Sequence, residues 1–296
     1  MSNREAAQPT SPFARVVWDG DRMRVGNVQF LLQQVGAPEL EPSVEGEPCF
    51  VLYKPQSLLD NYEAFFGSLP GYRPSRIFEI GIWKAGGAVF FTELFDVEKL
   101  VAIDLARQES RLSPITLAHL DLWLGKDDHR RRTKFYFEVD QGDGRRLQEI
   151  VRTEFSEALD LVVDDGSHLY GPTKRSFESL LPHVTPGGWY VIEDWSWSLV
   201  SAFQQAGHPW ALEIPLARLI GEILSLAGGR PDIVREMRVI GSMVFIQRGP
   251  CPLDSAFTIE GSISRPPHGR LALRLRRAWW SMVKFASTLA GQRRRP

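Results

Sequence analysis

The chain has 296 residues, of which 43% are hydrophobic and 24% charged, close to the average of a globular domain. It holds no stretch of the roughly 18–20 apolar residues that span a bilayer, and residues 1–12 lack the apolar core of a secretory signal. Two cysteines, Cys49 and Cys251, provide neither a disulfide framework nor zinc-site spacing. These features predict a cytoplasmic protein with reduced thiols.

The net charge of −1 is the balance of two unequal parts. Residues 265–296 hold eight Arg, one Lys and no acid; since the whole chain carries −1, residues 1–264 carry −10. The asymmetry predicts separate roles for an acidic body and a basic tail.

The first 48 residues are predicted to form an N-terminal segment. Residues 13–32 alternate apolar and polar side chains around Asp19-Gly20, which predicts a hairpin. Residues 36–48 are rich in Pro, Glu and Gly, which predicts a linker. Apolar residues at helical spacing then predict a helix over 55–69.

Strands and helices are predicted to alternate after this helix. Strands are expected over 76–80, 100–103, 134–139, 159–163 and 189–192, with helices over 86–94, 144–155, 173–181 and 215–226. Residues 235–240 and 243–247 flank Gly241-Ser242 and predict an antiparallel hairpin. The pattern predicts an α/β domain over 49–250, with a doubly wound, mostly parallel seven-stranded sheet that ends in the antiparallel hairpin.

A glycine-rich turn follows the first predicted strand of the alternation. Its sequence is Glu79-x-Gly81-x-x-x-x-Gly86-Gly87, and Asp104 closes the next strand. Glycines let a backbone approach a nucleotide-like ligand, and an acid at the end of the second strand can bind the two hydroxyls of a ribose. A purely structural turn is the alternative interpretation, which the two acids near successive strand ends disfavour.

This pattern resembles the cofactor site of class I S-adenosylmethionine (SAM) methyltransferases, a Rossmann-like family, over roughly residues 50–250. The resemblance implies that Asp104 binds the ribose and that Gly81 and Gly87 lie near the methionine part, with Glu79 beside them. It also implies that Gln141 and Asp143, in the loop after the third strand, lie near the adenine.

Two acidic segments end the next two predicted strands. Asp164-Asp165-Gly166-Ser167-His168 follows one apolar run, and Glu193-Asp194 follows the other. Ligands bind outside the carboxyl edge of open α/β sheets. Four acids and one imidazole gathered there would repel one another unless a cation or protons compensate. The sequence therefore predicts a site for a metal ion and a general base.

These segments look like the site of the metal-dependent sugar O-methyltransferases that tailor macrolide antibiotics. The resemblance implies that Asp165, Glu193 and Asp194 bind Mg²⁺ and that His168 is the general base. Asp164 is expected to be a hydrogen-bond acceptor or helix cap, or else to contact the SAM amino group; it is kept among the cofactor-binding candidates.

The chemistry of these residue types agrees with that division. Carboxylates are hard ligands suited to Mg²⁺ or Mn²⁺. A cation beside a sugar oxygen would lower the hydroxyl pKa, and a histidine, with an ordinary pKa of about 6.5, can accept the proton near neutral pH. Structural roles are the alternatives: His168 as a turn residue, and Glu193-Asp194 as a solvated loop pair. Trp195-Ser196-Trp197 is expected to form an aromatic substrate wall or part of the core.

The basic extension, 251–296, is predicted to contain an amphipathic helix over 269–290. Such a helix can lie on an anionic membrane surface or pack on the domain or on a second subunit, and both readings stay open. Membrane contact through residues 270–290, at the inner membrane face, would suit a glycolipid or envelope-glycan acceptor. No nucleic-acid partner is expected, because no base-reading motif accompanies the arginines.

The leading hypothesis is a SAM- and Mg²⁺-dependent O-methyltransferase that acts on a sugar hydroxyl of a natural product or glycan. The alternatives are the membrane-docked glycolipid enzyme, a non-haem iron hydroxylase and a non-catalytic SAM-binding scaffold. The hydroxylase is disfavoured because a facial triad needs a second histidine, and His183 is predicted to lie away from the strand ends. A nicotinamide dehydrogenase is disfavoured by the glycine spacing. The acceptor and the oligomeric state are left open.

Overall fold

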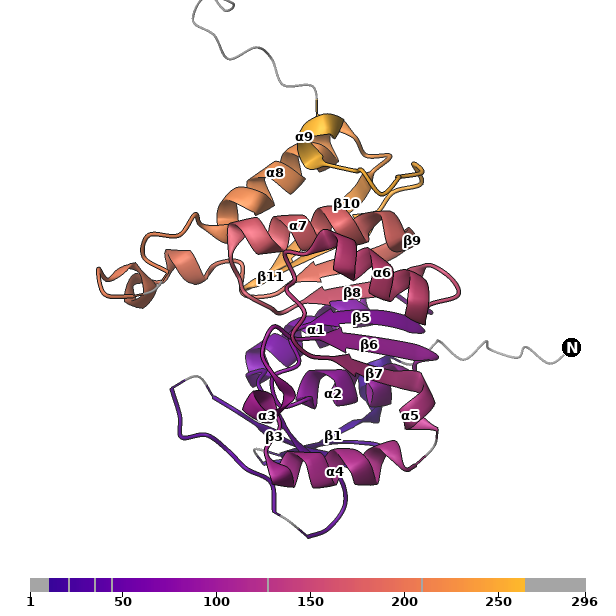
Figure 1. Cartoon of the computed structure of the whole chain (residues 1–296), viewed down its shortest axis with the longest axis vertical. Coiled ribbons are helices and arrows are strands. Elements are labelled where there is room, and N and C mark those ends of the chain that lie inside the picture. Colours follow the sequence, from indigo (N-terminus) through magenta and orange to yellow (C-terminus); the bar gives the residue numbers. More distant parts are fainter. Residues whose placement is uncertain are drawn as a thin grey trace, which may run out of the picture.

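The structure is a computed structural model that describes residues 11–263, apart from the single residues 21, 35, 44, 127 and 209. Helices and strands alternate along most of this range, as Figure 1 shows. The helix predicted over 269–290, and with it the proposed membrane contact, lies outside the described residues.

A seven-stranded sheet forms the centre of the molecule (Figure 1). Its order is β10-β11-β9-β8-β5-β6-β7. The strands are β5 (Arg76–Ile80), β6 (Lys99–Ile103), β7 (Thr133–Tyr136), β8 (Leu159–Asp164), β9 (Val184–Ile192), β10 (Val234–Ile240) and β11 (Met243–Arg248). The first five are parallel, whereas β11 pairs antiparallel with both β9 and β10. The predicted fold class is therefore confirmed.

Helices cover both faces of this sheet, which explains why its strands are apolar throughout. Residues of β8 enter two hydrophobic cores: Leu161 and Val163 pack with α1 and α2, and Leu159 and Val162 pack with α6, α7 and α8, with a register shift between Leu159 and Leu161. The helices concerned are α1 (Gln56–Gly67), α2 (Gly86–Phe95), α6 (Gly144–Glu154), α7 (Tyr170–Leu180) and α8 (Leu216–Gly229).

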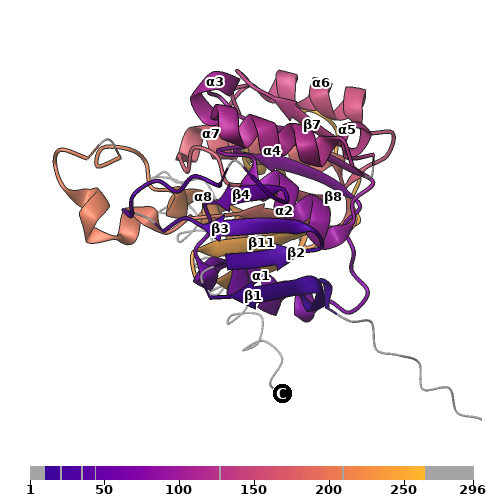
Figure 2. The same ribbon diagram turned by 90° about the horizontal axis from the view of Figure 1, so that it is seen from below.

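The N-terminal segment forms a second, four-stranded sheet, whose strands lie side by side in Figure 2. Its strands are β1 (Val16–Asp19), β2 (Arg22–Val25), β3 (Val28–Leu32) and β4 (Cys49–Leu52), preceded by the short helix η1 (Pro12–Arg15). The hairpin around Asp19-Gly20 is confirmed, since Asp19 pairs with Arg22. Phe30 of this sheet packs edge-on against Phe90 of α2, with ring centroids 5.8 Å apart. The packing is thus continuous across residue 48, where the sequence predicts a domain boundary.

The prediction omitted several elements and shortened others. It gave no strand at β4 and no helices between β6 and β7, where the structure has α3 (Gln108–Arg111), α4 (Pro114–Leu124) and α5 (His129–Arg132). Strand β9 begins at Val184 rather than at 189, directly after the short helix η2 (Leu181–His183).

An arm of the chain projects from the sheet between β9 and α8 (Figure 1). It contains the short helices η3 (Trp197–Leu199) and η4 (Ser201–Gln204); a last short helix, α9 (Ile259–Ser262), follows β11. Within the described ranges, every helix is too short or too polar to cross a membrane.

Candidate functional site

Four strand ends meet in register at the carboxyl edge of the large sheet. Ile80 of β5 pairs with Ile103 of β6 and with Asp164 of β8, and Asp164 pairs with Ile192 of β9. The residues that follow these four positions therefore emerge at one level: Gly81, Asp104, Asp165 and Glu193. This register explains why acids that are far apart in the sequence gather at one place.

A cavity of about 550 Å³ opens at this edge, a size that suits a ligand larger than a few atoms. The predicted site residues in its wall are Gly81, Asp104, Gln141, Asp165 and His168. The other predicted site residues do not line this cavity: Glu79, Gly87, Asp143, Asp164, Glu193 and Asp194.

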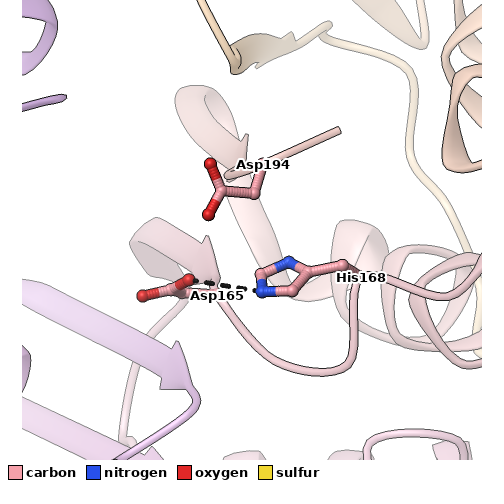
Figure 3. Close-up of side chains that lie close together, drawn as sticks. All are labelled: Asp165, His168 and Asp194. Atoms are coloured by element: carbon pink, nitrogen blue, oxygen red, sulfur yellow. Dashed lines mark ion pairs between the residues drawn. The ribbon is translucent and has the colours of Figure 1, made fainter. Parts of the chain in front are cut away.

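Asp165, His168 and Asp194 form what we call the outer cluster (Figure 3). One ligand atom from each lies within 4.8 Å of the others, and all three residues are half-buried. The Nε2 atom of His168 is 3.8 Å from Oδ1 of Asp165. His168 and Asp194 have φ angles of 55° and 50°, a left-handed conformation that is uncommon outside glycine and that clusters at functional sites.

Lys54, Tyr62 and Glu193 form an inner cluster beneath it. Lys54 lies two positions after β4, and its Nζ donates to both Glu193 carboxylate oxygens at 2.6 and 2.7 Å and to Oδ2 of Asp165 at 2.8 Å. The Tyr62 hydroxyl, from α1, donates to Oε1 of Glu193 at 2.6 Å. The sequence predicts that Glu193 binds a metal. In the structure, the carboxylate of Glu193 already accepts hydrogen bonds from the ammonium group of Lys54.

Burial and charge alter the titration of these groups. Burial raises the pKa of Glu79 to about 8, and repulsion from Asp165 and Glu193 adds to it against the attraction of Lys54. Burial also raises the pKa of Glu193 to about 8, with Asp165 adding to the effect. Burial alone would lower the pKa of Lys54, but the charges of Asp165 and Glu193 outweigh it and raise the pKa above its ordinary value. One ammonium faces three carboxyl groups here, so burial and mutual repulsion favour the neutral forms of the two buried glutamates.

Asp104 closes β6 and lines the cavity, as the sequence predicts. Its carboxylate accepts hydrogen bonds from the backbone of Ile82, Trp83 and Ala106, so it also fixes the glycine-rich turn. The guanidinium of Arg111 lies 3.1 Å from both carboxylate oxygens. A ligand hydroxyl that binds Asp104 would share the carboxylate with Arg111.

The two glycines of the turn are needed for different reasons. Gly81 has a φ of 103°, and a Cβ there would lie 2.2 Å from the carbonyl oxygen of Asp165. A Cβ at Gly87 would lie 2.2 Å from Oε1 of Glu79. Oε2 of Glu79 is buried and has no hydrogen-bond partner among the described residues. Gly81 thus lets the turn pack against the Asp165 loop, and Gly87 leaves room for Glu79.

The remaining predicted cofactor residues hold the loops together. Gln141 donates from Nε2 to Asp164 at 3.2 Å and accepts from the backbone N–H of Ser167 at 2.6 Å. Asp164 is buried and also accepts from Ser176 and Tyr190, so the structure makes it a hydrogen-bond acceptor, one of the two roles expected for it. Asp143 caps α6 by accepting from the backbone N–H of Arg146.

The aromatic residues of the wall are Tyr53, Trp83 and Trp210, none of them in the segment that the sequence indicates. Trp197 is buried, and its indole donates to the carbonyl of His168 at 2.7 Å. Trp210, farther along the arm, packs on Trp197 with ring centroids 4.5 Å apart and lines the cavity 6.2 Å from the His168 ring. Of the two roles expected for the Trp195-Ser196-Trp197 segment, Trp197 therefore has the buried one, and the cavity wall takes Trp210 instead, 13 positions beyond Trp197.

Sequence reasoning missed Lys54, Tyr62, Arg111 and Trp210. Lys54 lies two positions after the strand Cys49–Leu52, and that run of four apolar or thiol residues was the available signal. Tyr62 was identified as part of the apolar face of a helix, but its hydroxyl contact with Glu193 spans 131 positions and leaves no local pattern.

Comparison with known proteins identifies the central part of the chain. Residues 78–195 match the model of a family described as a methyltransferase domain. Mycinamicin VI 2''-O-methyltransferase of Micromonospora griseorubida is 32% identical over 126 residues, which are 40% of this chain and 27% of that protein. An 8-demethyl-8-alpha-L-rhamnosyl tetracenomycin-C 2'-O-methyltransferase of Streptomyces olivaceus is 36% identical over 81 residues, 27% of this chain and 21% of that protein.

The chain therefore spans only about a quarter of the length of these curated relatives. Among solved structures, the MycE methyltransferase of the mycinamycin pathway, in complex with Mg and SAH, has a TM-score of 0.46 at 22% identity; the match covers 64% of this chain and 48% of that one. The family match and the two relatives agree with the resemblance to methyltransferases, and residues 78–195 of this chain are similar to a methyltransferase domain.

Proposed function

We propose that the protein is a SAM- and Mg²⁺-dependent O-methyltransferase that methylates a sugar hydroxyl of a glycosylated small molecule. The observation that carries this proposal is the outer cluster of two carboxylates and one imidazole, which lies beside a cavity walled by Gly81 and Asp104. The names of the relatives, which act at 2' and 2'' oxygens of glycosylated antibiotics, support the substrate class.

The outer cluster fits a hard divalent cation. Asp165 and Asp194 offer carboxylate oxygens, and Mg²⁺ is commonly bound by one or two carboxylates while it keeps several waters. Glu193, the third ligand expected from the sequence, is bonded to Lys54, so a metal would have to compete with that ammonium for it.

The cavity fits the methyl donor. Asp104 lies at its wall where a ribose would be bound, and Gly81 leaves the backbone open beside it. Oε2 of Glu79, buried without a partner in the described chain, is available to a donor group behind the turn. Gln141 is proposed to line the adenine side, while the contact of Asp143 with the base stays a prediction, because its side chain caps α6.

In the proposed reaction His168 accepts the proton of the acceptor hydroxyl. His168 is half-buried at the cavity wall, and its backbone carbonyl accepts a hydrogen bond from Trp197, which anchors the loop that carries the imidazole. Asp165, 3.8 Å away, stabilises the imidazolium that forms. When bound, the metal lowers the pKa of the hydroxyl and the sulfonium supplies an electrophilic methyl group. The chain contributes mainly alignment of the oxygen with that methyl group.

The iron hydroxylase alternative has weaker support. A facial triad uses two histidines and one carboxylate, whereas the outer cluster holds one histidine and two carboxylates. His183 lies in η2, at the start of β9, which is the opposite end of the strand from Glu193.

The proposed base is tested by His168→Ala. The substitution should lower turnover by roughly 10²–10⁴-fold on a glycosylated acceptor such as mycinamicin VI, because proton transfer contributes about that factor. SAM affinity, measured by calorimetry, should change little, since His168 lies on the acceptor side. A variant that keeps its turnover would remove His168 from the mechanism.

A further inference from the structure

The arm between β9 and α8 leaves the sheet directly at the acidic site. It runs over residues 193–215, begins with Glu193-Asp194 and projects away from the sheet (Figure 1). Its described residues form the two short helices η3 and η4 and irregular turns. Loops longer than about 12–15 residues with little secondary structure are usually functional in a compact domain. The position of the arm suits contact with a ligand in the cavity.

Four rings form a small aromatic cluster within the arm. Trp210 packs on the other three, with ring centroids 4.5 Å from Trp197, 5.4 Å from Phe203 and 5.4 Å from His208. Of these four residues, Trp210 is the one that lines the cavity. The indole of Trp197 donates to the backbone carbonyl of His168, so the cluster is bonded to the loop that carries the proposed base.

Trp210 lies next to the imidazole of that base. Its ring centroid is 6.2 Å from that of His168, with the two ring planes 78° apart. A sugar whose hydroxyl is hydrogen-bonded to His168 would therefore bring its C–H groups close to the Trp210 ring. These C–H groups form an apolar face, and an indole offers a large, rigid apolar surface for such a face.

Trp83, the other tryptophan in the cavity wall, lies beside the proposed ribose site. Its backbone N–H donates to Oδ2 of Asp104 at 3.2 Å, and the guanidinium of Arg111 lies 5.1 Å from the centroid of its ring. Tyr53 packs against it, with ring centroids 5.1 Å apart. One tryptophan thus accompanies the acid proposed to bind the methyl donor, and Trp210 accompanies the base proposed to act on the acceptor.

We propose that Trp210 is an acceptor-binding residue, whose ring packs on the C–H face of the sugar while the reacting hydroxyl is hydrogen-bonded to His168. This inference rests on the proposed function for the identity of the acceptor as a sugar. It adds that the arm recognises the acceptor, whereas the methyl donor is bound at the sheet edge.

The test is glycoside binding by the full chain loaded with Mg²⁺ and S-adenosylhomocysteine, so that no methyl transfer occurs. Mycinamicin VI, methyl α-L-rhamnoside and methyl β-D-glucoside are the probes, titrated by calorimetry. For each probe that the wild type binds, Trp210→Ala should weaken binding by at least about tenfold, because the ring contact and its buried apolar area are lost. Wild-type affinity in Trp210→Ala would overturn the proposal.

A pair of milder variants separates a binding role from a packing role within the arm. Trp210→Phe and Trp210→Leu both keep an apolar side chain against the aromatic cluster, but only phenylalanine keeps a ring. Trp210→Phe should bind the glycoside within about threefold of the wild type, and Trp210→Leu at least about threefold more weakly than Trp210→Phe. Equal affinities of these two variants would overturn the stacking role.

Trp83→Ala is the matched control, because it also removes an indole from the cavity wall. It should weaken S-adenosylhomocysteine binding and leave glycoside binding within about threefold, whereas Trp210→Ala should do the reverse. Glycoside binding that is lost in Trp83→Ala and kept in Trp210→Ala would contradict the assignment.

The role of Trp210 and the proposed function can fail separately. A chain that binds and methylates a glycoside equally well with Trp210→Ala contradicts the role of Trp210 alone. A chain that binds a glycoside through Trp210 but transfers no methyl group contradicts the proposed function alone. A wild-type chain that binds none of the three glycosides contradicts both.

Discussion

At the scale of single residues, the site combines acids that could be predicted with a lysine that could not. Asp104, Asp165 and Asp194 stand directly at or after strand ends, so the strand pattern alone places them at one sheet edge. Lys54 lies outside the strand–helix alternation, and it contacts Glu193, which is 139 positions farther along the sequence. A lysine before a proline gives no local sign of burial, because the burial is produced entirely by tertiary packing.

The role of Asp104 is tested by Asp104→Ala. Removing a carboxylate that binds ligand hydroxyls should weaken SAM binding by roughly 10- to 100-fold, since a hydrogen bond to a charged group is worth about 1.5–3 kcal/mol. Isothermal titration calorimetry measures this directly. SAM affinity that stays at the wild-type level would contradict the ribose role.

The matched control is Asp143→Ala, which removes an acid that caps α6. Loss of a helix cap should lower the free energy of unfolding by about 1 kcal/mol. SAM affinity should fall much less than in Asp104→Ala. A loss as large as that of Asp104→Ala would instead indicate the adenine contact predicted from the sequence.

Glu79 makes stability depend on pH. The folded protein raises its pKa from 4.5 to about 8, so the neutral form is favoured in the fold. The stabilisation is fully present below pH 4.5 and is lost as the pH rises through about 8. In thermal melts between pH 5 and 9, Glu79→Gln, which cannot ionise, should gain stability relative to the wild type as the pH rises. A difference in melting temperature that does not change with pH would contradict the assignment.

At the scale of elements, buried strands were predictable and atypical helices were not. The apolar runs of β5, β6, β8 and β9 are covered on both faces and stand out in the sequence. Helix α4 has apolar residues on all sides, from Ile115 to Leu124, and so lacks the helical period that a pattern needs. Strand β4 has only four residues, and the sequence pattern did not distinguish it from the neighbouring linker.

The turn between β5 and α2 depends on Gly81. Alanine there would adopt a positive φ and bring its Cβ to 2.2 Å from the Asp165 carbonyl, so Gly81→Ala should cost a few kcal/mol of stability and abolish SAM binding. Chemical denaturation and calorimetry measure the two effects. Gly221→Ala is the control: Gly221 lies within α8 with open space around its Cα, so alanine should stabilise by up to about 1 kcal/mol. Equal stability of the two variants would contradict the described turn.

At the scale of the whole molecule, the N-terminal sheet and the methyltransferase domain share one core. Phe13, Met23 and Phe30 pack in the same cluster as Phe90 and Phe91 of α2. The sequence separated these parts because residues 36–48 look like a linker, and a linker pattern does not reveal how the two ends pack.

Removal of residues 1–48 tests this shared core. The truncated protein would expose the apolar residues that β2 and β3 cover, so it should lose cooperative thermal unfolding or aggregate. Circular dichroism melts of both proteins measure this. A truncated protein that melts cooperatively at the wild-type temperature would instead support an independent domain that begins near residue 49.

The most direct test of the proposed activity is SAM consumption on a panel of glycosides, measured with the full chain in Mg²⁺, after EDTA, and after Mg²⁺ is restored. Methyl transfer should occur to at least one glycoside, vanish with the chelator and return with the metal, because the outer cluster has to hold a cation beside the hydroxyl. Methyl transfer that continues unchanged in EDTA would contradict the metal-dependent mechanism.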